Sequence, residues 1–406
     1  MELSFKDENK VRIFTATHHG NVLGYVAIDS TVGGRSCGGL RMLQDIDEAE
    51  IRALARSMTL KYGFLGLPQG GAKAGVIGDP EAPQAERLNR LVKFGHAIKP
   101  LLNTKTFVPT SDMGTNDADI RYMLNAVGIY VGRRELQSNS SGYYTAQSVL
   151  AGVVESARHM GLNLSKCAAA IEGFGNVGRP LTNLLDKAGI KVVAISTSRG
   201  GLYNPRGLEV DRLIRSADEA GSQVVEIYRE GQFIKHEALL ELPVDVLCPC
   251  ARWNSIHSGN AVRISAHIIC PGANNPVTSE AERALFEREV LCLPDFVTNC
   301  GGVLGGTMEF ASVSRKKITA FIDRHIGERI SWLLNETKAK SVLPRDVATP
   351  FALHRFEQVV RSADHPTPLG QLFNVALEFY RRGWIPGSLV SALSPLYFKR
   401  ILATPV

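Results

Sequence analysis

The chain has 406 residues, of which 44% are hydrophobic, and a formal net charge of +6 at pH 7. At roughly 150 residues per domain, this length predicts two to three domains with ample core. Basic residues are spread along the chain without interleaved aromatic residues, and no apolar run reaches the length of about 18 residues that a membrane span needs, so neither nucleic acid nor a membrane is an expected partner. Seven cysteines without zinc-site spacing predict no metal site and a reducing compartment. Because the first residues also lack an apolar signal segment, the protein is expected to be cytoplasmic.

The first predicted elements are strands within residues 11–31, joined by a turn at Gly20-Asn21. Two glycine pairs follow, at 33–34 and 38–39, and they flank Cys37. Glycine pairs allow the backbone to approach a ligand closely, so Gly38 and Gly39 are candidate ligand contacts; a plain flexible turn is the alternative.

The stretch MTLKYGFLGLPQGGAKAGVIGDP, residues 58–80, contains two lysines. Helical spacing upstream places Lys61 near the end of an amphipathic helix, and Gly70-Gly71 opens a tight backbone segment before Lys73. A lysine in a glycine-lined cleft near a second cation has its charged form disfavoured, which lowers its pKa. This pattern predicts Lys73 as a general base and Lys61 as an anchor for a carboxylate, with two solvated surface lysines as the alternative.

A helix is predicted over residues 84–102, and Asp112 then lies at the end of a strand, between Pro109 and Gly114. Asp112 is a candidate carboxylate partner for Lys73. Capping a helix or closing a turn is an equally ordinary role for an aspartate at this place.

The polar, glycine-rich residues 133–145 indicate a domain boundary. Beyond it, a strand at 167–171 leads into Gly173-x-Gly175-x-x-Gly178, a helix, and a second strand at 191–195. A glycine pattern in this strand–helix–strand context is a strong dinucleotide signal, because the turn lets the pyrophosphate reach the N-terminus of the helix.

The second strand of this unit ends in Ser196, Thr197 and Ser198, with Arg199 next, where an acid would bind the adenosine ribose. Without an acid to repel it, and with a cation at hand, a 2′-phosphate becomes acceptable. The predicted cofactor is NAD or NADP, with a slight preference for NADP.

Three further strands are predicted, and each ends in a loop of small or amide residues: 244–250, 267–276 and 289–296. From about Ala311 onward the pattern is helical. The predicted fold is α/β, with an N-terminal substrate domain (1–138), a Rossmann-type doubly wound dinucleotide domain (139–320) and a helical C-terminal segment (321–406) that packs back on the first domain. Apolar stripes near the C-terminus indicate an oligomer surface rather than membrane contact.

Together these residues resemble the glutamate/leucine/phenylalanine/valine dehydrogenase family over roughly residues 10–310. The most specific match is LPQGGAKAGVIGDP, which resembles the family signature around a catalytic lysine. Further matches lie in the family's order and spacing: GGLRM (38–42), MTLK (58–61), SDMGT (111–115), GFGNVG (173–178), PGANNP (271–276) and LPDFVTNCGGV (293–303).

This resemblance implies reversible oxidative deamination of an L-amino acid to a 2-oxo acid and ammonia, with hydride transfer to a nicotinamide, by a homo-oligomer. Lys61 would bind the α-carboxylate, Lys73 would activate water and Asp112 would exchange protons with the substrate nitrogen. Cofactor contacts are implied at Thr145, Asn274 and the fingerprint with its Asn176. Neighbouring loop and strand-end positions are further cofactor candidates: Val177, Thr197, Arg199, Ala251 and Asn299.

Substrate choice departs from the glutamate branch of the family. Glutamate-specific members carry a lysine just before the GG of the GGLR motif and a serine three residues after the GGV valine, where this chain has Cys37 and Gly306. A buried distal carboxylate would then lack its partner, which is costly. We therefore expect a neutral aliphatic or aromatic side chain in a pocket lined by Cys37, Thr110, Val303 and Gly306.

Glutamate is the alternative substrate, and it would require Arg35 or Arg41 as a replacement cation. An alternative from another class is a catalytically silent nucleotide sensor, which would be expected to lack Lys73 or Asp112. A hydroxy-acid dehydrogenase would need a His–Asp or His–Glu pair, and neither His257 nor His267 has an evident role of this kind.

Overall fold

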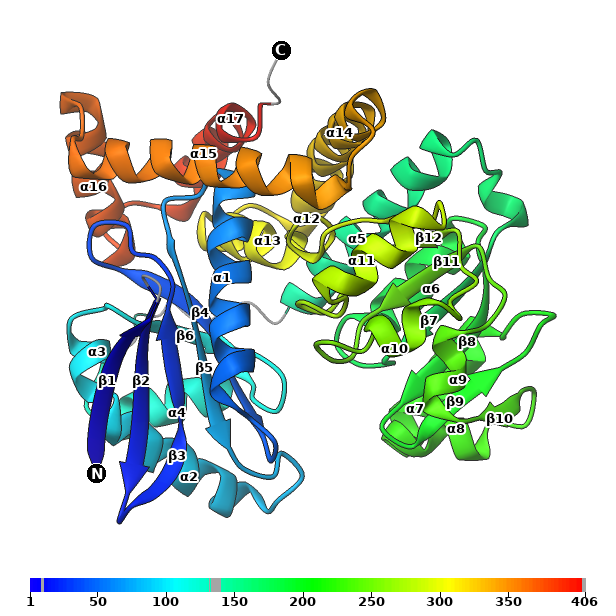
Figure 1. Ribbon diagram of the computed structural model, residues 1–406. Helices are drawn as coiled ribbons and strands as arrows, with labels where there is room; N and C mark the ends of the chain where they lie inside the picture. The colour runs from blue at the N-terminus through cyan, green and yellow to red at the C-terminus, as the bar shows by residue number, and fades with distance from the viewer. Residues whose placement is uncertain (9–10, 131, 133–139, 404–406) are drawn as a thin grey trace. The chain divides into compact units, whose positions relative to one another are not determined.

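The structure is a computed structural model that describes residues 1–8, 11–130, 132 and 140–403. It divides into two compact units, shown in Figure 1. Unit 1 comprises residues 1–139, 310–312 and 350–401, and unit 2 comprises residues 140–309, 313–349 and 402–406.

Unit 1 contains a six-stranded sheet in the order β1-β2-β3-β5-β4-β6. Its strands are β1 (Glu2–Glu8), β2 (Val11–His18), β3 (Asn21–Ile28), β4 (Ser36–Leu43), β5 (Gly70–Ile77) and β6 (Val108–Ser111). The first three strands and β5 pair in antiparallel fashion, whereas β4 runs parallel to both β5 and β6. The predicted strands within 11–31 are confirmed as β2 and β3. The mostly exposed edge strand β1 was missed because its sequence, ELSFKDE, is largely polar.

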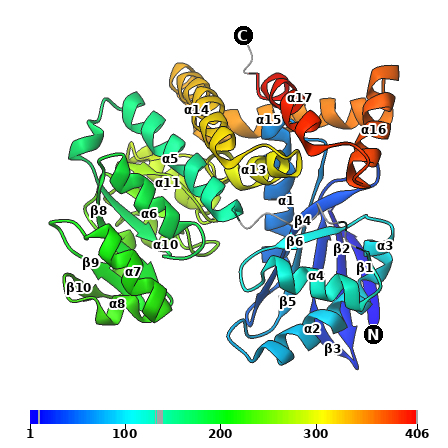
Figure 2. The same cartoon turned by 180° about the vertical axis from the view of Figure 1, so that it is seen from behind.

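Helices cover both faces of this sheet. They are α1 (Glu48–Leu65), α2 (Gln84–Ala97), α3 (Lys99–Asn103) and α4 (Asp117–Ala126). The helix α1 buries Ile51 and Ala55 on one face, and α2 and α4 bury apolar side chains such as Phe94 and Met123 on the other. Figure 2 shows α2 and α4 from behind. Because side chains alternate along a strand, β5 turns Ala72 and Ala74 to the second face and Lys73 to the face of α1.

Unit 2 contains a seven-stranded sheet in the order β10-β9-β8-β7-β11-β12-β13. Its strands are β7 (Ala168–Glu172), β8 (Lys191–Thr197), β9 (Gly200–Tyr203), β10 (Gln232–Ile234), β11 (Val246–Pro249), β12 (Ile268–Ile269) and β13 (Leu291–Cys292). Five neighbouring strands of this sheet run parallel, namely β8, β7, β11, β12 and β13. This arrangement confirms the predicted doubly wound sheet. The antiparallel edge formed by β9 and β10 was not predicted.

Ten helices of the described chain begin in unit 2 before the C-terminal helices: α5 (Ser141–His159), α6 (Gly178–Lys187), α7 (Val210–Ala220), α8 (Val224–Ile227), α9 (His236–Leu240), α10 (Ser258–Ala261), α11 (Ser279–Glu287), α12 (Asp295–Thr298), α13 (Gly301–Phe310) and α14 (Arg315–Lys340). Two 3₁₀ turns accompany them, η1 (Leu164–Lys166) and η2 (Gly221–Gln223). The long α14 packs on α5 and buries Ile318, Ile322, Ile326 and Ile330, which lie at helical spacing.

The last helices are α15 (Pro344–Asp364), α16 (Pro368–Arg381) and α17 (Gly387–Ile401). Residues 321–406 were predicted to form one helical segment packed on the first domain, but the structure divides this segment at Pro350, inside α15. The reason is the isoleucine stripe of α14, which is buried within unit 2. The predicted boundary at 138/139 lies outside the described residues.

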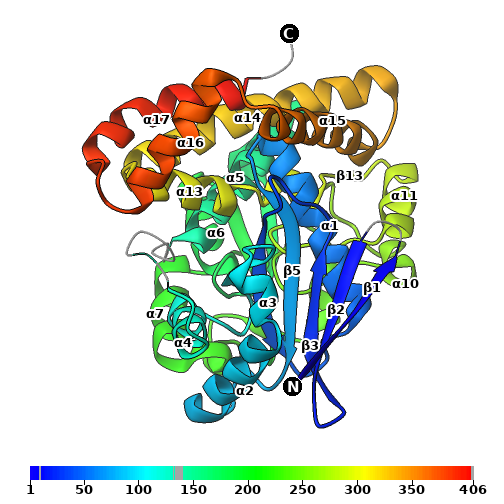
Figure 3. The same ribbon diagram turned by 90° about the vertical axis from the view of Figure 1, so that its left-hand side faces the viewer.

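In unit 1, α15 packs on α1, and α16 and α17 form a hairpin that Figure 3 shows. The rings of Phe64 and Phe351 meet edge to face with centroids 6.0 Å apart, and those of Phe373 and Tyr397 stack at 5.6 Å. The Tyr380 hydroxyl donates to the Phe310 carbonyl oxygen at 2.6 Å. In the described part of the chain, no helix is both long and apolar enough to cross a bilayer.

Candidate active site

Lys73 lies in the middle of β5, a strand whose residues are buried almost throughout. Glycines on either side of it explain the burial. A Cβ at Gly71 would collide with Thr59 of α1, and one at Gly75 would come within 2.6 Å of Ile51, so these glycines let the helix lie directly on the strand. Lys73 is consequently only 2% exposed.

The structure brings Lys73 together with Asp112. The Lys73 Nζ forms an ion pair with the Asp112 Oδ2. Lys73 lies in β5 and Asp112 directly follows β6, and these two strands lie on either side of β4. Gly39 of β4 lies between them: a Cβ there would come within 2.8 Å of the Asp112 Cβ and 3.0 Å of the Lys73 Nζ. Gly39, a candidate ligand contact from the sequence, therefore leaves the room that this ion pair needs.

Arg41 and Glu50 extend the ion pair into a buried cluster of four charged side chains. The Arg41 guanidinium donates to the Asp112 Oδ2 from Nε at 3.4 Å and from one Nη at 3.3 Å, and its other Nη forms an ion pair with Glu50. Arg41 is 4% exposed and Glu50 is 1% exposed. From the sequence, Arg41 was a candidate only as a substitute anchor for glutamate, and Glu50 was missed.

Electrostatics in this cluster favour the neutral form of Lys73 and the ionised form of Asp112. Burial, assisted by the positive charges of Arg41 and Lys61 and opposed by Asp112, lowers the pKa of Lys73 to about 8. Burial alone would raise the pKa of Asp112, but the charges of Arg41 and Lys73 outweigh it and hold that pKa well below its usual range. Lys73 can therefore release its proton close to neutral pH.

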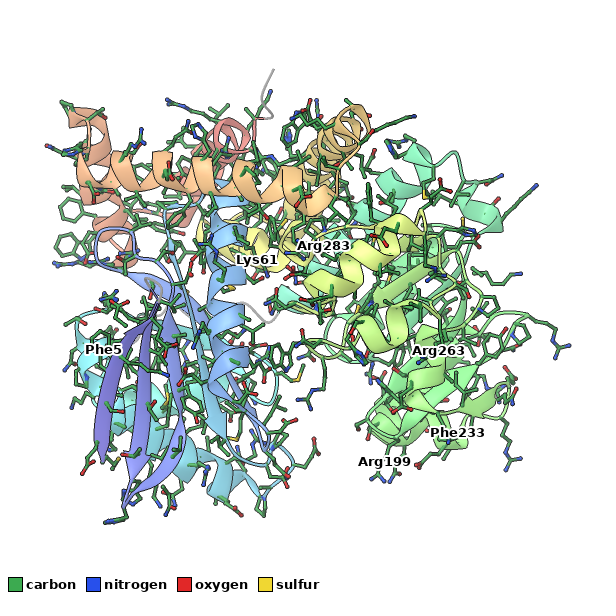
Figure 4. All side chains as sticks on the ribbon, in the orientation of Figure 1. Phe5, Lys61, Arg199, Phe233, Arg263 and Arg283 are labelled. Atoms are coloured by element: carbon green, nitrogen blue, oxygen red, sulfur yellow. The ribbon has the colours of Figure 1, made fainter. Side chains whose placement is uncertain are left out.

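Lys61 lies near the end of α1 and is 5% exposed, so the alternative of two solvated surface lysines is not what the structure shows. Lys61 is labelled in the stick view of Figure 4. The adjacent Tyr62 hydroxyl donates to the Cys37 carbonyl oxygen at 3.5 Å, which ties α1 to β4.

Two of the four predicted pocket residues lie in unit 1. Cys37 pairs with Val108 between β4 and β6, and Thr110 pairs with Gly39 in the same ladder. Burial raises the pKa of the Cys37 thiol, which keeps this position neutral. Val303 and Gly306 lie one helical turn apart on α13, which belongs to unit 2.

The glycine fingerprint of unit 2 lies in the turn between β7 and α6. Gly173 adopts a φ of +91°, and a Cβ at Gly178 would collide with the Gly173 carbonyl oxygen. A Cβ at Gly175 would meet nothing within 4 Å, so this part of the loop borders open space. The loop is fixed to β8, since the Phe174 N–H donates to the Ser196 carbonyl oxygen at 2.6 Å. These residues fit a pyrophosphate at the start of α6.

The other predicted cofactor residues form two groups in unit 2. Ala251 adjoins the fingerprint, because a Cβ at Gly173 would lie 2.9 Å from that of Ala251. The Asn299 amide donates to the Asn274 side-chain oxygen at 2.9 Å, joining the two loops. A Cβ at Gly272 would lie 3.0 Å from a Val177 methyl group, which places the second loop beside the fingerprint as well.

The remaining candidates have local partners. The Thr197 hydroxyl donates to the Ser222 carbonyl oxygen at 2.7 Å, and Arg199 is exposed, as Figure 4 shows. The Thr145 hydroxyl donates to the Ser141 carbonyl oxygen within α5, and Asn176 is exposed at the fingerprint.

A buried carboxylate beside the fingerprint was missed. Glu172 ends β7 and is 1% exposed; it accepts from the Ser255 hydroxyl at 3.0 Å and lies 3.2 Å from the His236 Nε2. This hydrogen bond raises the pKa of His236. The position of Glu172 directly before a glycine fingerprint was a signal, but its partners lie 64 and 83 residues further along the chain.

The amide loop at Asn274 is held by a second missed cluster. Arg345 bridges Glu282 and Asp295, at 2.6 and 3.1 Å, and Asp295 also accepts from the Asn275 backbone N–H at 3.0 Å. Arg345 therefore fixes the loop indirectly, from the start of α15.

Comparison with known proteins shows which family the chain resembles. A family model described as Glutamate/Leucine/Phenylalanine/Valine dehydrogenase matches residues 138–358, and a second, described as Glu/Leu/Phe/Val dehydrogenase, dimerisation domain, matches residues 6–128. A glutamate dehydrogenase of Thermotoga maritima is 37% identical over 313 residues, which cover 73% of this chain and 72% of the relative. The catabolic NAD-specific glutamate dehydrogenase RocG of Bacillus subtilis is 34% identical over 309 residues, covering 73% and 70%.

Among solved structures, the leucine-bound hetero-hexameric glutamate dehydrogenase of Thermus thermophilus matches with a TM-score of 0.74 at 21% identity. The match covers 87% of this chain and 89% of the other, and it shows a shared fold. The chain belongs to the Glu/Leu/Phe/Val dehydrogenase family and is an NAD(P)-dependent amino acid dehydrogenase.

Proposed function

We propose that this protein catalyses the reversible oxidative deamination of an L-amino acid with a neutral side chain to a 2-oxo acid and ammonia. The observation that carries the proposal is the buried contact between Lys73 and Asp112, with Lys61 buried in the same unit. A carboxylate anchor, a base for water and a proton carrier for nitrogen are what this reaction requires of a protein. A bound nicotinamide would supply the hydride acceptor.

Each side chain has a separate task in this proposal. Lys61 binds the α-carboxylate of the substrate. Lys73, in its neutral form, removes a proton from the water that attacks the imino acid, and Asp112 carries protons to and from the departing nitrogen. A silent nucleotide sensor would not need the Lys73–Asp112 pair, so an enzyme is the better account of these contacts.

The test of these roles is replacement of Lys73 by alanine. We expect oxidation of the amino acid, followed by the absorbance of the reduced nicotinamide, to fall by at least about a thousandfold, because base catalysis and the charge partner of Asp112 are lost together. Affinity for the nicotinamide cofactor should change little, since its fingerprint lies in unit 2. Wild-type rates in this variant would refute the mechanism.

A neutral side chain is favoured by the cations of unit 1. In the described part of this unit, the buried cations are Lys61, Lys73 and Arg41. The first two have proposed tasks, and Arg41 is engaged by Glu50 and Asp112, which removes it as the substitute anchor for glutamate. Arg35 is exposed. A second substrate carboxylate beside Cys37 would therefore lie without a cation from this unit.

Glutamate is the second candidate substrate, because the relatives from Thermotoga maritima and Bacillus subtilis are named glutamate dehydrogenases. A panel of L-amino acids assayed at one pH separates the two. We expect an aliphatic or aromatic amino acid to give the highest kcat/KM. If glutamate gave the highest value, the proposed substrate class would be wrong, whereas the proposed oxidative deamination would stand.

Replacing Cys37 by lysine tests the pocket directly. The variant supplies the missing cation, so we expect kcat/KM for glutamate to rise at least tenfold relative to that for the best neutral substrate. Cys37→Met, which adds bulk without charge, is the matched control. An unchanged preference in Cys37→Lys would show that Cys37 does not face the substrate side chain.

For the cofactor, we propose that NADP is accepted alongside NAD. The exposed Arg199 and the lack of an acid among Ser196, Thr197 and Ser198 support a 2′-phosphate, whereas the Bacillus subtilis relative is named NAD-specific. Measuring kcat/KM with both cofactors decides this, and Arg199→Ala should weaken only the NADP reaction.

We also propose that the chain forms a homo-oligomer. Its first domain matches a family model described as a dimerisation domain, and the hairpin of α16 and α17 in the same unit exposes large apolar side chains. These are Leu372, Phe373, Val375, Phe379, Trp384, Leu389, Leu393 and Leu396. An exposed apolar surface of this extent is typical of a protein–protein contact. A second copy is a better occupant than a membrane, because membrane-surface helices need a strongly charged face and α16 and α17 carry few charges.

A further inference from the structure

We propose that Arg41, held in place by Glu50, is a positioning residue that keeps the Asp112 carboxylate ionised and aimed at Lys73 during turnover. The inference rests on the proposed roles of Lys73 and Asp112. It assigns a task to two buried charged residues that the mechanism above leaves unused.

The geometry of the guanidinium supports this role. Arg41 presents two donors, Nε at 3.4 Å and one Nη at 3.3 Å, to the same Asp112 oxygen that contacts Lys73. Its remaining Nη pairs with Glu50, so the planar fork is fixed at both ends. A guanidinium held in this way cannot rotate away from Asp112 without leaving Glu50.

The burial of this charged cluster indicates a functional role. Arg41, Glu50 and Lys73 are each less than 5% exposed, and removing a charge from water is costly unless it is paired. A fold that needed only stability could fill this space with apolar side chains at similar or lower cost. The retained charges therefore point to the chemistry of the site.

The groups that face Asp112 come from three elements. Arg41 approaches from β4 and Lys73 from β5, while the Met113 backbone N–H donates to the other carboxylate oxygen at 2.8 Å. The Thr115 hydroxyl accepts from the Asp112 N–H at 3.1 Å and so fixes the backbone of the same turn. With Arg41 removed, Lys73 would remain as the cation in direct contact with the Asp112 carboxylate.

Loss of Arg41 should raise the pKa of Lys73. The positive charge of Arg41 disfavours the protonated form of Lys73, so a neutral residue in its place raises the pKa of Lys73. The proposed base acts only when unprotonated. The acid limb of the pH profile must then move to higher pH.

Glu50 also connects the acid–base pair to the carboxylate anchor. It lies in the first turn of α1, where Asp47 accepts its N–H at 2.7 Å, and Lys61 lies near the other end of the same helix. One rigid element therefore sets both the position of Arg41 and that of Lys61. Loosening the Glu50 contact should disturb the orientation of Asp112 without removing any charge next to it.

The experiment compares kcat/KM against pH for the wild type, Arg41→Gln, Arg41→Lys and Glu50→Gln. For Arg41→Gln we expect the acid limb of the pH profile to shift by about one unit towards higher pH. We also expect kcat at pH 7 to fall at least tenfold, with little change in KM. Arg41→Lys, which keeps the charge but not the fork, should return the limb to its wild-type position while leaving kcat below wild type. Glu50→Gln should lower kcat with a smaller shift of the limb.

Arg87→Gln is the matched control. Arg87 pairs with the buried Asp119 at 2.8 Å in the same unit. Asp119 belongs to the capping box of α4, and the pair does not touch Asp112. It should lower the thermal midpoint without moving the pH profile. If Arg41→Gln does not fold, Arg41→Lys and Glu50→Gln carry the test through kcat and the thermal midpoint.

Two outcomes overturn the inference, and a third concerns only the proposed function. A pH profile of Arg41→Gln that superimposes on the wild type refutes the role of Arg41, as does a limb shift of equal size in Arg87→Gln. Full activity of Lys73→Ala would instead refute the proposed mechanism, whatever the Arg41 variants do.

Discussion

The chemistry proposed for this enzyme depends on how a lysine can lose its proton near neutral pH inside a protein. Burial between β5 and α1 does most of this work, and the glycines at 71 and 75 make the burial possible. Gly39 has the complementary task of leaving room for Asp112 to reach Lys73. Three residues without side chains therefore define the environment of the two that react.

This environment predicts the pH dependence of the reaction. Lys73 has a pKa of about 8 and must be neutral to act as a base, so kcat/KM for amino acid oxidation should increase with pH and level off above about 8. Steady-state rates measured across pH 6–10 check this. An acid limb near the ordinary lysine value of 10.5 would contradict the buried, paired state of Lys73.

At the scale of elements, local signals were predictable and long-range pairings were not. The fingerprint at 173–178 could be found because its strand, turn and helix are contiguous, and Lys73 stood out through its glycine neighbours. Glu50 looked like an ordinary acid in the first turn of a helix, and only the packing of α1 on the sheet brings it to Arg41. In the same way, Glu172 meets His236 and Ser255 through the sheet of unit 2 rather than through sequence proximity.

The start of α15 provides an element-scale prediction. Arg345→Met leaves the buried Glu282 and Asp295 without their cation, so we expect unit 2 to lose about 3 kcal/mol of stability. Because Asp295 also accepts from Asn275, the affinity for the nicotinamide cofactor should fall too. Urea unfolding and cofactor titration measure the two effects. Arg361→Met on the same helix removes only an exposed pair with Glu357 and should change neither; equal losses in both variants would contradict the role of Arg345.

At the scale of the whole molecule, the exposed apolar side chains of α16 and α17 predict self-association. Leu389, Leu393 and Leu396 recur at helical spacing along one side of α17, which suits packing against another helix. Leu393→Glu places a charge in this stripe, so we expect the molar mass by light scattering to fall at least twofold. Phe233→Glu, at an exposed apolar position in β10, is the control. An unchanged mass in Leu393→Glu, or binding of the wild type to anionic vesicles, would show that another partner covers the hairpin.

The division of the chain at Pro350 has a consequence for protein synthesis. Unit 1 is built from the first and the last parts of the chain, and Phe351 and Ala352 of α15 contact Phe64 and Gly63 of α1. At about 5–20 residues per second, a ribosome needs roughly fifteen to sixty seconds to make the residues between α1 and this part of α15. During that interval the apolar end of α1 has no α15 to cover it, so the nascent chain should be a substrate for chaperones until its last helices emerge.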